Sequence, residues 1–158
     1  YKPRIDKEIL AEHSNGLIAL SGCLQGEAAS RISDGDIEGA RESVAAYRDI
    51  FGKDRFLLEV QRHGIDRQDV VNEALSGLAK EFGLRLCATN DLHYVHRSDS
   101  EAHDVLLCVG TASNVSDTNR LKFETEEFYL KSAAQMADLF RDLARRPNRG
   151  TPGILPRC

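Results

Sequence analysis

Three runs of strand length alternate with longer amphipathic patterns along the chain, and this order constrains the fold more than any other feature. The runs are Leu17–Ser21, Phe56–Gly64 and Leu84–Thr89. Between them, residues 33–52 and 66–83 carry apolar side chains at helical spacing. Strand–helix–strand order with short connections predicts parallel pairing, because two parallel strands need a crossover that a helix usually supplies. The sequence therefore predicts an α/β fold.

The amphipathic pattern at residues 66–83 predicts the clearest helix. Asp66 is expected at its N-terminal cap and Gly83 at its end. The side chains expected on its buried face are Val70, Ala74, Leu78 and Phe82. In the other long pattern, Asp34 or Asp36 is the expected cap and Gly52 the expected end. Shorter helices are predicted within residues 1–16, 98–111 and 133–143.

The composition suits one packed domain. The 158 residues include 41% hydrophobic and 29% charged side chains. The net charge of −4 argues against a broadly basic nucleic-acid surface, although a local patch remains compatible with it.

No apolar run reaches transmembrane length, and the N-terminus has neither an initiator methionine nor a signal-peptide core, so we expect a piece of a longer protein. The widely spaced cysteines suit reduced thiols in the cytoplasm.

An acid and a histidine follow the third run, in the stretch ATNDLHY. On an extended strand, Asp91 and His93 would project from the same face, about 7 Å apart. A carboxylate and an imidazole together suit Zn²⁺ or Mn²⁺. From the residues alone two interpretations stay open. The pair binds metal, or Asp91 caps a helix or simply satisfies the histidine by a hydrogen bond.

Polar residues also lie at the ends of the first two runs. Cys23 could ligate a metal or pack as a buried thiol, and Glu27 could complete a site or cap the next helix. Glu59, Gln61 and His63 alternate onto one face of the second run. Such a polar stripe is costly in a barrel interior unless it serves a site, and it is unremarkable on an exposed face. No G-x-G-x-x-G, Walker A, G-x-S-x-G or H-E-x-x-H motif is present. The candidates alone are too few for a complete metal site.

Four stretches resemble a known family. They are NGLIALSGCLQGE, LEVQRHGIDRQDVVNEAL, LCATNDLHYVHRSDSEAHDVLLCVGT and RLKFETEEFYLKS. Together they resemble the PHP (polymerase and histidinol phosphatase) domain of bacterial DNA polymerase III alpha subunits, the C-family replicative polymerases. The resemblance runs from about Tyr1 to Leu143 and concerns the later part of that domain. The family's opening H-x-H motif, and the further ligands that follow it, are missing from this sequence.

The resemblance implies a partial PHP-type distorted (β/α)₇ barrel, TIM-like, in which residues 1–143 supply the later strands and helices only. It also implies a metal cluster at the carboxyl mouth of the barrel. The ligands that carry over by motif are Cys23, Asp91 and His93. Glu59 and His63 match the family outside its principal ligand positions, and are expected to line the site, orient ligands or contact phosphate.

The function implied is that of a fragment of a DNA-directed DNA polymerase, a nucleotidyltransferase of DNA replication. In this family the PHP domain is either a metal-dependent 3′–5′ exonuclease that proofreads or a structural part. Clustered divalent ions would activate a water and stabilise charge on the phosphodiester. The implied cofactors are Zn²⁺ or Mn²⁺ in the PHP site and Mg²⁺ in a polymerase site outside this chain. The implied partners are DNA, the sliding clamp, and proofreading and clamp-loader subunits, in the cytoplasm and without a membrane.

Two other hypotheses stay open. One is a piece of a free-standing PHP metal-dependent phosphoesterase, histidinol-phosphatase-like; the other is a purely structural module. Residues 144–158, ARRPNRGTPGILPRC, depart from the family and pack three prolines and four arginines together. This tail is expected to be disordered or the product of a shifted reading frame, and a basic nucleic-acid arm is the alternative.

Overall fold

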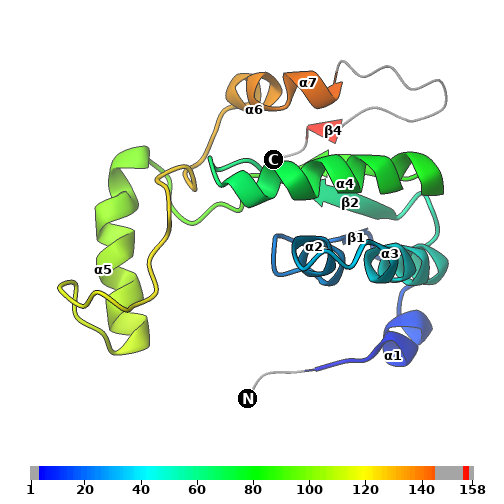
Figure 1. Ribbon diagram of the computed structural model, residues 1–158, viewed down its shortest axis with the longest axis horizontal. Helices are drawn as coiled ribbons and strands as arrows, with labels where there is room; N and C mark the ends of the chain where they lie inside the picture. The colour runs from blue at the N-terminus through cyan, green and yellow to red at the C-terminus, as the bar shows by residue number, and fades with distance from the viewer. Residues whose placement is uncertain (1–3, 145–154, 157–158) are drawn as a thin grey trace.

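A parallel sheet forms the centre of the computed structural model, which describes residues 4–144 and 155–156 (Figure 1). The strands, in spatial order, are β1 (Ala19–Leu20), β2 (Phe56–Val60), β3 (Arg85–Ala88) and β4 (Leu155–Pro156). Each neighbouring pair is parallel. The predicted α/β fold is therefore confirmed, and the three predicted runs supply β1, β2 and β3. The strands are shorter than the runs because the carboxyl ends of the runs turn into polar loops.

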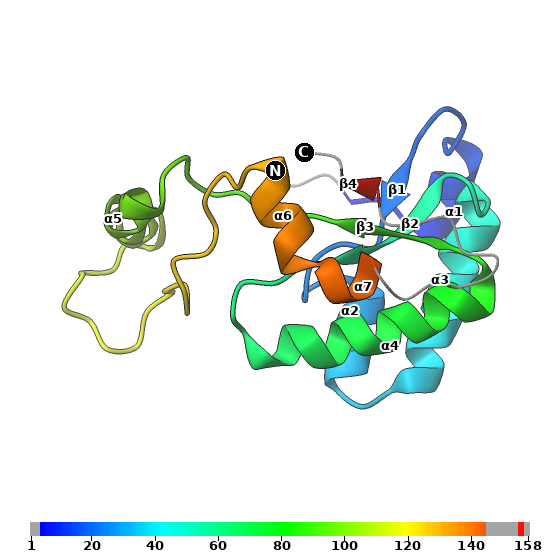
Figure 2. The same cartoon turned by 90° about the horizontal axis from the view of Figure 1, so that it is seen from above.

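Some of the helices cover one face of this sheet. The helices of the described residues are α1 (Lys7–Glu12), α2 (Glu27–Ser33), α3 (Ile37–Phe51), α4 (Asp66–Phe82), the 3₁₀ turn η1 (Arg97–Asp99), α5 (Ser100–Thr111), α6 (Ala133–Leu139) and α7 (Arg141–Ala144). Figure 2 shows α2, α3 and α4 together on one side of the strands. The alternation of β2 places Phe56 and Leu58 in the core beneath these helices. This arrangement leaves the carboxyl ends of the strands to the loops that carry the candidate site.

The helix ends follow local chemistry. The carboxylate of Asp36 accepts a hydrogen bond from the backbone N–H of Gly39 (2.9 Å) at the start of α3. Gly52 ends α3, and Gly83 ends α4 in the left-handed conformation with φ of 64°, as predicted. The predicted cap of α4 is wrong by one residue, because Ile65 holds the cap position and Asp66 is the first helical residue.

The predicted buried face of α4 is right in part. Leu78 is buried, and Ala74 and Phe82 are partly buried against the same core, whereas Val70 is 64% exposed. The fully buried residues Val71, Leu75 and Ala79 were not predicted. Both stripes have helical spacing, so periodicity alone could not choose between them. The choice depends on tertiary packing against β2 and α2.

A second, smaller core joins α6 and α7 to the sheet. Met136, Phe140 and Leu143 pack against Val60 of β2 and Ala88 of β3. The side chain of Ser132 caps α6 by accepting a hydrogen bond from Gln135 N, at 3.3 Å. The C-terminal helices are therefore attached at the carboxyl ends of the two central strands.

Helix α5 stands apart from this body. Figures 1 and 2 both show it well away from the sheet and from α2, α3 and α4. Cys108 is the residue of α5 that is buried. The helix is carried by the loop that leaves β3 and by the segment that returns to α6, so it forms an arm between the third strand and the C-terminal helices.

The finer fold predictions keep their status as predictions. These are the partial (β/α)₇ barrel and the division of the chain into residues 1–143 and 144–158. Most of the predicted tail, at 145–154 and 157–158, lies outside the described residues, whereas Leu155–Pro156 form β4 beside β3. Within the described residues, no helix combines the length and the apolar character needed to cross a bilayer.

Candidate functional site

Polar side chains at the carboxyl ends of the strands form one hydrogen-bonded group. An oxygen of the Glu59 carboxylate accepts hydrogen bonds from Gln61 Nε2 (3.0 Å) and from the Thr89 hydroxyl. The backbone N–H of Glu59 donates to Ser21 Oγ (2.8 Å). The side chains of Glu59 and Gln61 therefore project from the same face of the strand, as predicted. The residues lie at or just beyond the carboxyl ends of three neighbouring parallel strands, and the sheet brings them together although they are distant in sequence.

Cys23 lies beside this group, half-buried in the loop after β1. With Glu59 and Gln61 it lines a cavity of about 10 Å³, which is close to the lower limit for one water molecule. Cys87 lies opposite Glu59 in the ladder between β2 and β3. Burial raises the pKa of the Cys87 thiol, and the nearby Glu59 adds to this effect, so Cys87 is a neutral thiol at pH 7.

Asp91 and His93 lie in a loop beyond the end of β3. Asp91 has a φ of 44°, in the left-handed region, so the predicted alternation along an extended strand is wrong. The Nδ1–H of the exposed His93 donates to the carbonyl oxygen of Asp91 (2.6 Å), and this hydrogen bond does not use Nε2. The ring also packs edge-on against Phe123, with centroids 4.7 Å apart. A histidine oriented by a carbonyl in this way has the arrangement found in metal-binding histidines.

His63 is fully buried, and both of its ring nitrogens are used. Nε2 donates to the carbonyl oxygen of Asn90 (2.8 Å), and Nδ1 accepts from Gln68 Nε2 (2.7 Å). The ring stacks on Phe128, with centroids 4.1 Å apart. Burial lowers the pKa of His63, so the ring stays neutral at pH 7. His63 therefore positions the loop after β3, and no nitrogen is left to ligate a metal or to contact phosphate.

A buried lysine holds the other side of this loop. Lys131 Nζ donates to Asn90 Oδ1 (3.1 Å) and to the backbone carbonyl of Glu127, and it pairs with the Glu127 carboxylate (3.1 Å). Asn90 Nδ2 donates to the carbonyl oxygens of Glu127 (3.1 Å) and Tyr129 (2.6 Å). The loop that carries Asp91 and His93 is therefore fixed between α4 and residues 127–131.

The three predicted metal ligands are not gathered into one cluster. Over residues 4–144 and 155–156, no three His, Cys, Asp or Glu side chains come together in a way that could hold a metal ion. Cys23 lies beside Glu59, whereas His93 packs against aromatic side chains. Both ring nitrogens of His63 are already used in hydrogen bonds. The donors in the described residues do not fit a complete metal centre, and the ligand assignment of Cys23, Asp91 and His93 stays a prediction.

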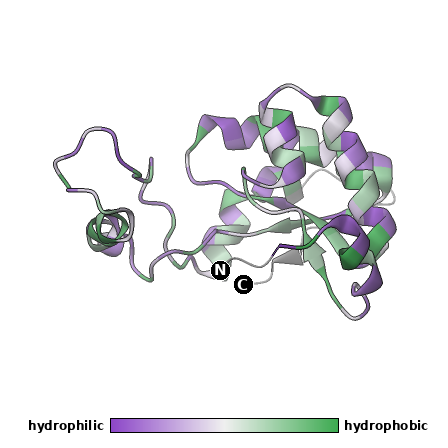
Figure 3. Ribbon diagram, turned by 90° about the horizontal axis from the view of Figure 1, so that it is seen from below, coloured by the Kyte–Doolittle hydropathy of each residue, from purple (hydrophilic) through white to green (hydrophobic). Residues whose placement is uncertain are grey.

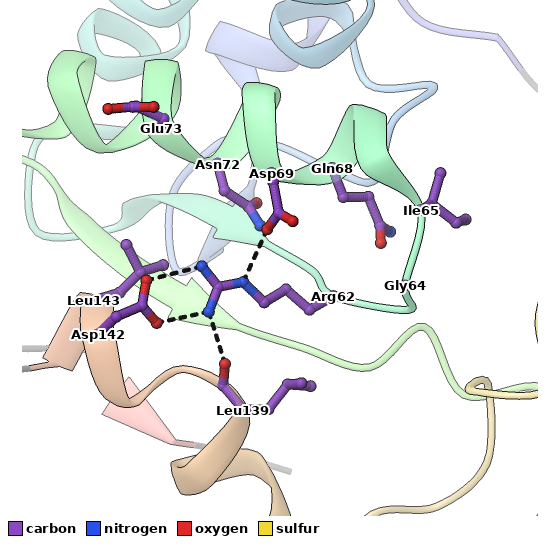
Figure 4. A pocket seen from close by; sticks show the side chains of 10 residues that line it. All are labelled: Arg62, Gly64, Ile65, Gln68, Asp69, Asn72, Glu73, Leu139, Asp142 and Leu143. Atoms are coloured by element: carbon purple, nitrogen blue, oxygen red, sulfur yellow. Dashed lines mark hydrogen bonds and ion pairs between the residues drawn. The ribbon is translucent and has the colours of Figure 1, made fainter.

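A cleft of about 510 Å³ lies between α4 and the C-terminal helices (Figure 4). Arg62 crosses it, and its guanidinium forms two hydrogen bonds with Asp142 (2.6 and 2.9 Å), one with the carbonyl oxygen of Leu139 (2.7 Å) and one with Asp69 (3.2 Å). The hydrogen bonds from Arg62 lower the pKa of Asp142 to about 2. Arg62 thus connects the end of β2 to α6 and α7.

We expect Arg62→Ala to lower the free energy of unfolding by about 1–2 kcal/mol and to speed hydrogen exchange in α6 and α7. The loss is modest because the Asp142 side chain is 51% exposed, and water screens the ion pair. Urea denaturation and exchange mass spectrometry measure both effects. Arg41→Ala, which removes a surface pair with Glu81, is the matched control and should cost less than about 0.5 kcal/mol. Equal exchange in both variants would show that Arg62 does not secure these helices.

Comparison with known proteins identifies the chain's relatives. Residues 1–63 match the family model of the PHP domain. The chain is 50% identical over 140 residues to the DNA polymerase III subunit alpha of Treponema pallidum (strain Nichols), and 48% identical over 143 residues to that of Borreliella burgdorferi. The chain is homologous to part of the DNA polymerase III alpha subunit. The matches cover 89% and 90% of this chain but 12% of each relative.

The sequence resemblance to the PHP region of DNA polymerase III alpha subunits is therefore confirmed. A third relative, from Deinococcus radiodurans, is 44% identical over 136 residues and carries the same name. The match to these subunits continues well beyond residue 63, where the PHP model match ends. The candidate site, which extends to residue 131, therefore lies partly within the PHP match and partly in the region shared with the polymerase subunits.

Sequence reasoning missed several residues that hold the site together. Thr89 and Asn90 stood directly before Asp91 but were not singled out. The residues missed elsewhere are Arg62, Gln68, Asn72 and Lys131. Gln68 and Asn72 could have been found from the sequence, because they lie four residues apart on the inward face of α4. Burying polar side chains there costs free energy unless they form hydrogen bonds with other buried groups. The amide of Asn72 indeed donates to the carbonyl oxygen of Gln61 (2.8 Å).

Proposed function

We propose that the chain serves as part of the PHP region of a replicative DNA polymerase III alpha subunit, a DNA-directed DNA polymerase. The observation that carries this proposal is the 50% identity over 140 residues with a subunit of that name. The whole protein would bind DNA and other replisome subunits in the cytoplasm. The polymerase relatives favour this function over a free-standing phosphoesterase.

The partial (β/α)₇ barrel belongs to the same proposal. Parallel strands joined by helices that cover one face of the sheet are the repeating unit of such barrels. Within the described residues β1 pairs with β2 alone, and Leu17 and Ile18 before it are exposed. The edge of β1 that faces away from β2 is the place where a further strand of the barrel would pair. We assign residues 1–143 to the later part of the barrel and residues 144–158 to a tail that departs from the family, although Leu155–Pro156 of this tail pair with β3.

We expect the purified 158-residue chain neither to extend a primer nor to shorten a 3′ end. The described donors do not complete a metal centre, and the polymerase residues of the family lie outside this chain. Gel assays with a labelled primer and template measure both reactions, with the full-length Treponema pallidum subunit as a positive control. Nucleotide incorporation by the purified chain would contradict the proposal that it is one part of a larger enzyme.

We further propose that Cys23, Asp91 and His93 bind Zn²⁺ or Mn²⁺ only together with side chains supplied from outside this chain. In a longer polypeptide that carries the H-x-H motif, Asp91→Asn combined with His93→Ala should lower bound metal by about half or more, because ligands act as a set. Elemental analysis measures the metal content. Asp49→Asn with His13→Ala replaces an exposed acid and an exposed histidine elsewhere and is the control. Unchanged metal in the first variant would favour a purely structural module.

A further inference from the structure

The outer face of α5 is apolar and exposed. Val105, Leu106 and Val109 are 50%, 64% and 75% exposed, and Ala102 and Gly110 beside them are exposed as well. These positions fall on one side of a helix. Figure 3 shows hydrophobic residues along α5, which projects from the rest of the molecule. Since none of these five residues carries a charge, a surface that covers this face must itself be apolar.

The opposite face of α5 is already occupied by the chain itself. Asp104 accepts two hydrogen bonds from the guanidinium of Arg120 (2.6 and 2.7 Å), whose side chain is 6% exposed. His103 packs edge-on against Phe123, with centroids 4.8 Å apart, and Cys108 is buried. The orientation of α5 is therefore set by its own return segment, and the apolar face is a defined surface.

The size of this face favours a tethered occupant over a second copy of the chain. A helix of this length is about 18 Å long and about 10 Å wide, which gives a footprint well below the roughly 800 Å² that each partner of a stable dimer buries. A segment of the same polypeptide meets the face at an effective concentration on the order of millimolar, so a small contact suffices. The matched region makes up only 12% of the relatives, which extend far beyond it.

We propose that the outer face of α5 docks an amphipathic helix from another part of the longer polypeptide, beyond the 158 residues of this chain. Small residues such as Ala102 and Gly110 permit close approach of a second helix. The contact would hold the PHP region against a neighbouring part of the same molecule. This inference rests on the proposed function, because it requires a longer chain of the DNA polymerase III alpha kind.

Hydrogen exchange in α5 tests the proposal in two proteins, the 158-residue chain and the longer polypeptide encoded at the same locus. Exchange of the α5 amides should be at least about ten-fold slower in the longer polypeptide. Leu106→Asp should abolish this difference, because it places a charge in the apolar contact. Val70→Asp is the matched control, since Val70 is also 64% exposed but lies on α4, and it should leave the difference unchanged.

The outcomes separate this inference from the proposed function. If the longer polypeptide copies DNA but its α5 exchanges as fast as in the 158-residue chain, the docking contact is wrong and the proposed function stands. If the longer polypeptide does not copy DNA, the proposed function is wrong. If sedimentation shows the 158-residue chain as a dimer that Leu106→Asp dissociates, a second copy covers the face, and the tethered helix is overturned.

Discussion

His63→Ala should lower the free energy of unfolding by about 4 kcal/mol, the largest single-residue effect expected at the site. The substitution removes the stack on Phe128 and leaves the Gln68 amide and the Asn90 carbonyl without their partners in a buried environment. Each unpaired buried group costs about 1–3 kcal/mol. Urea denaturation followed by circular dichroism measures the change in the midpoint and in the extrapolated free energy.

Two variants make this expectation specific. His13→Ala removes an exposed histidine and should change the free energy of unfolding by less than about 0.5 kcal/mol. Gln68→Leu removes the amide that donates to Nδ1, so it should reproduce part of the loss while leaving His63 in place. A cost below about 1 kcal/mol for His63→Ala would show that the ring is not an essential link between β2 and the loop after β3.

The same residue should make stability depend on pH. Burial lowers the pKa of His63 below its ordinary value of 6.5, so near pH 6 the unfolded state binds a proton that the folded state does not. Stability is therefore fully present above about pH 6.5 and falls as the pH decreases below it. The stability difference between the native protein and His63→Ala should accordingly be smaller at pH 5 than at pH 8. An equal difference at both values would mean that the pKa of His63 is the same in the folded and unfolded states.

The features that could be predicted from the sequence depend on local chemistry. Asp36 caps α3, and Gly83 ends α4 in a left-handed conformation that glycine adopts without strain. The polar group at the end of β2 could also be predicted in part, because Glu59 and Gln61 alternate onto one face. These inferences need only the positions of residues within one element.

The remaining features depend on contacts between distant segments. The left-handed φ of Asp91 is not dictated by its residue type, and it places Asp91 and His93 in a loop where an extended strand was predicted. The hydrogen bond between Asn90 and Glu127 joins residues 37 positions apart, and no local sequence pattern predicts it. The stripe of Gln68, Asn72 and Ser76 on α4 was the overlooked signal, since all three are buried and polar groups on a buried face require partners.

Lys131→Ala should be the second most damaging substitution, with a loss of about 3 kcal/mol in the free energy of unfolding. The Lys131 side chain is 5% exposed, and its ammonium pairs with the Glu127 carboxylate. It also donates hydrogen bonds to the backbone carbonyl of Glu127 and to the side-chain oxygen of Asn90. Its ammonium also lies 4.1 Å from the centroid of the Tyr129 ring. Removing it leaves several acceptors without a donor, although Glu127 is 28% exposed and keeps Arg97 at 3.1 Å.

Lys131→Met separates the charge from the packing, because methionine keeps most of the apolar stem but donates no hydrogen bond. We expect it to recover less than half of the loss, and hydrogen exchange at residues 90–94 should be faster in both variants. Lys122→Ala, at an exposed position in the same return segment, is the control and should be nearly neutral. If Lys131→Met were as stable as the native protein, the apolar stem of the side chain would be sufficient for stability. The loop that carries Asp91 and His93 would then be held by packing and by His63 rather than by the buried ammonium.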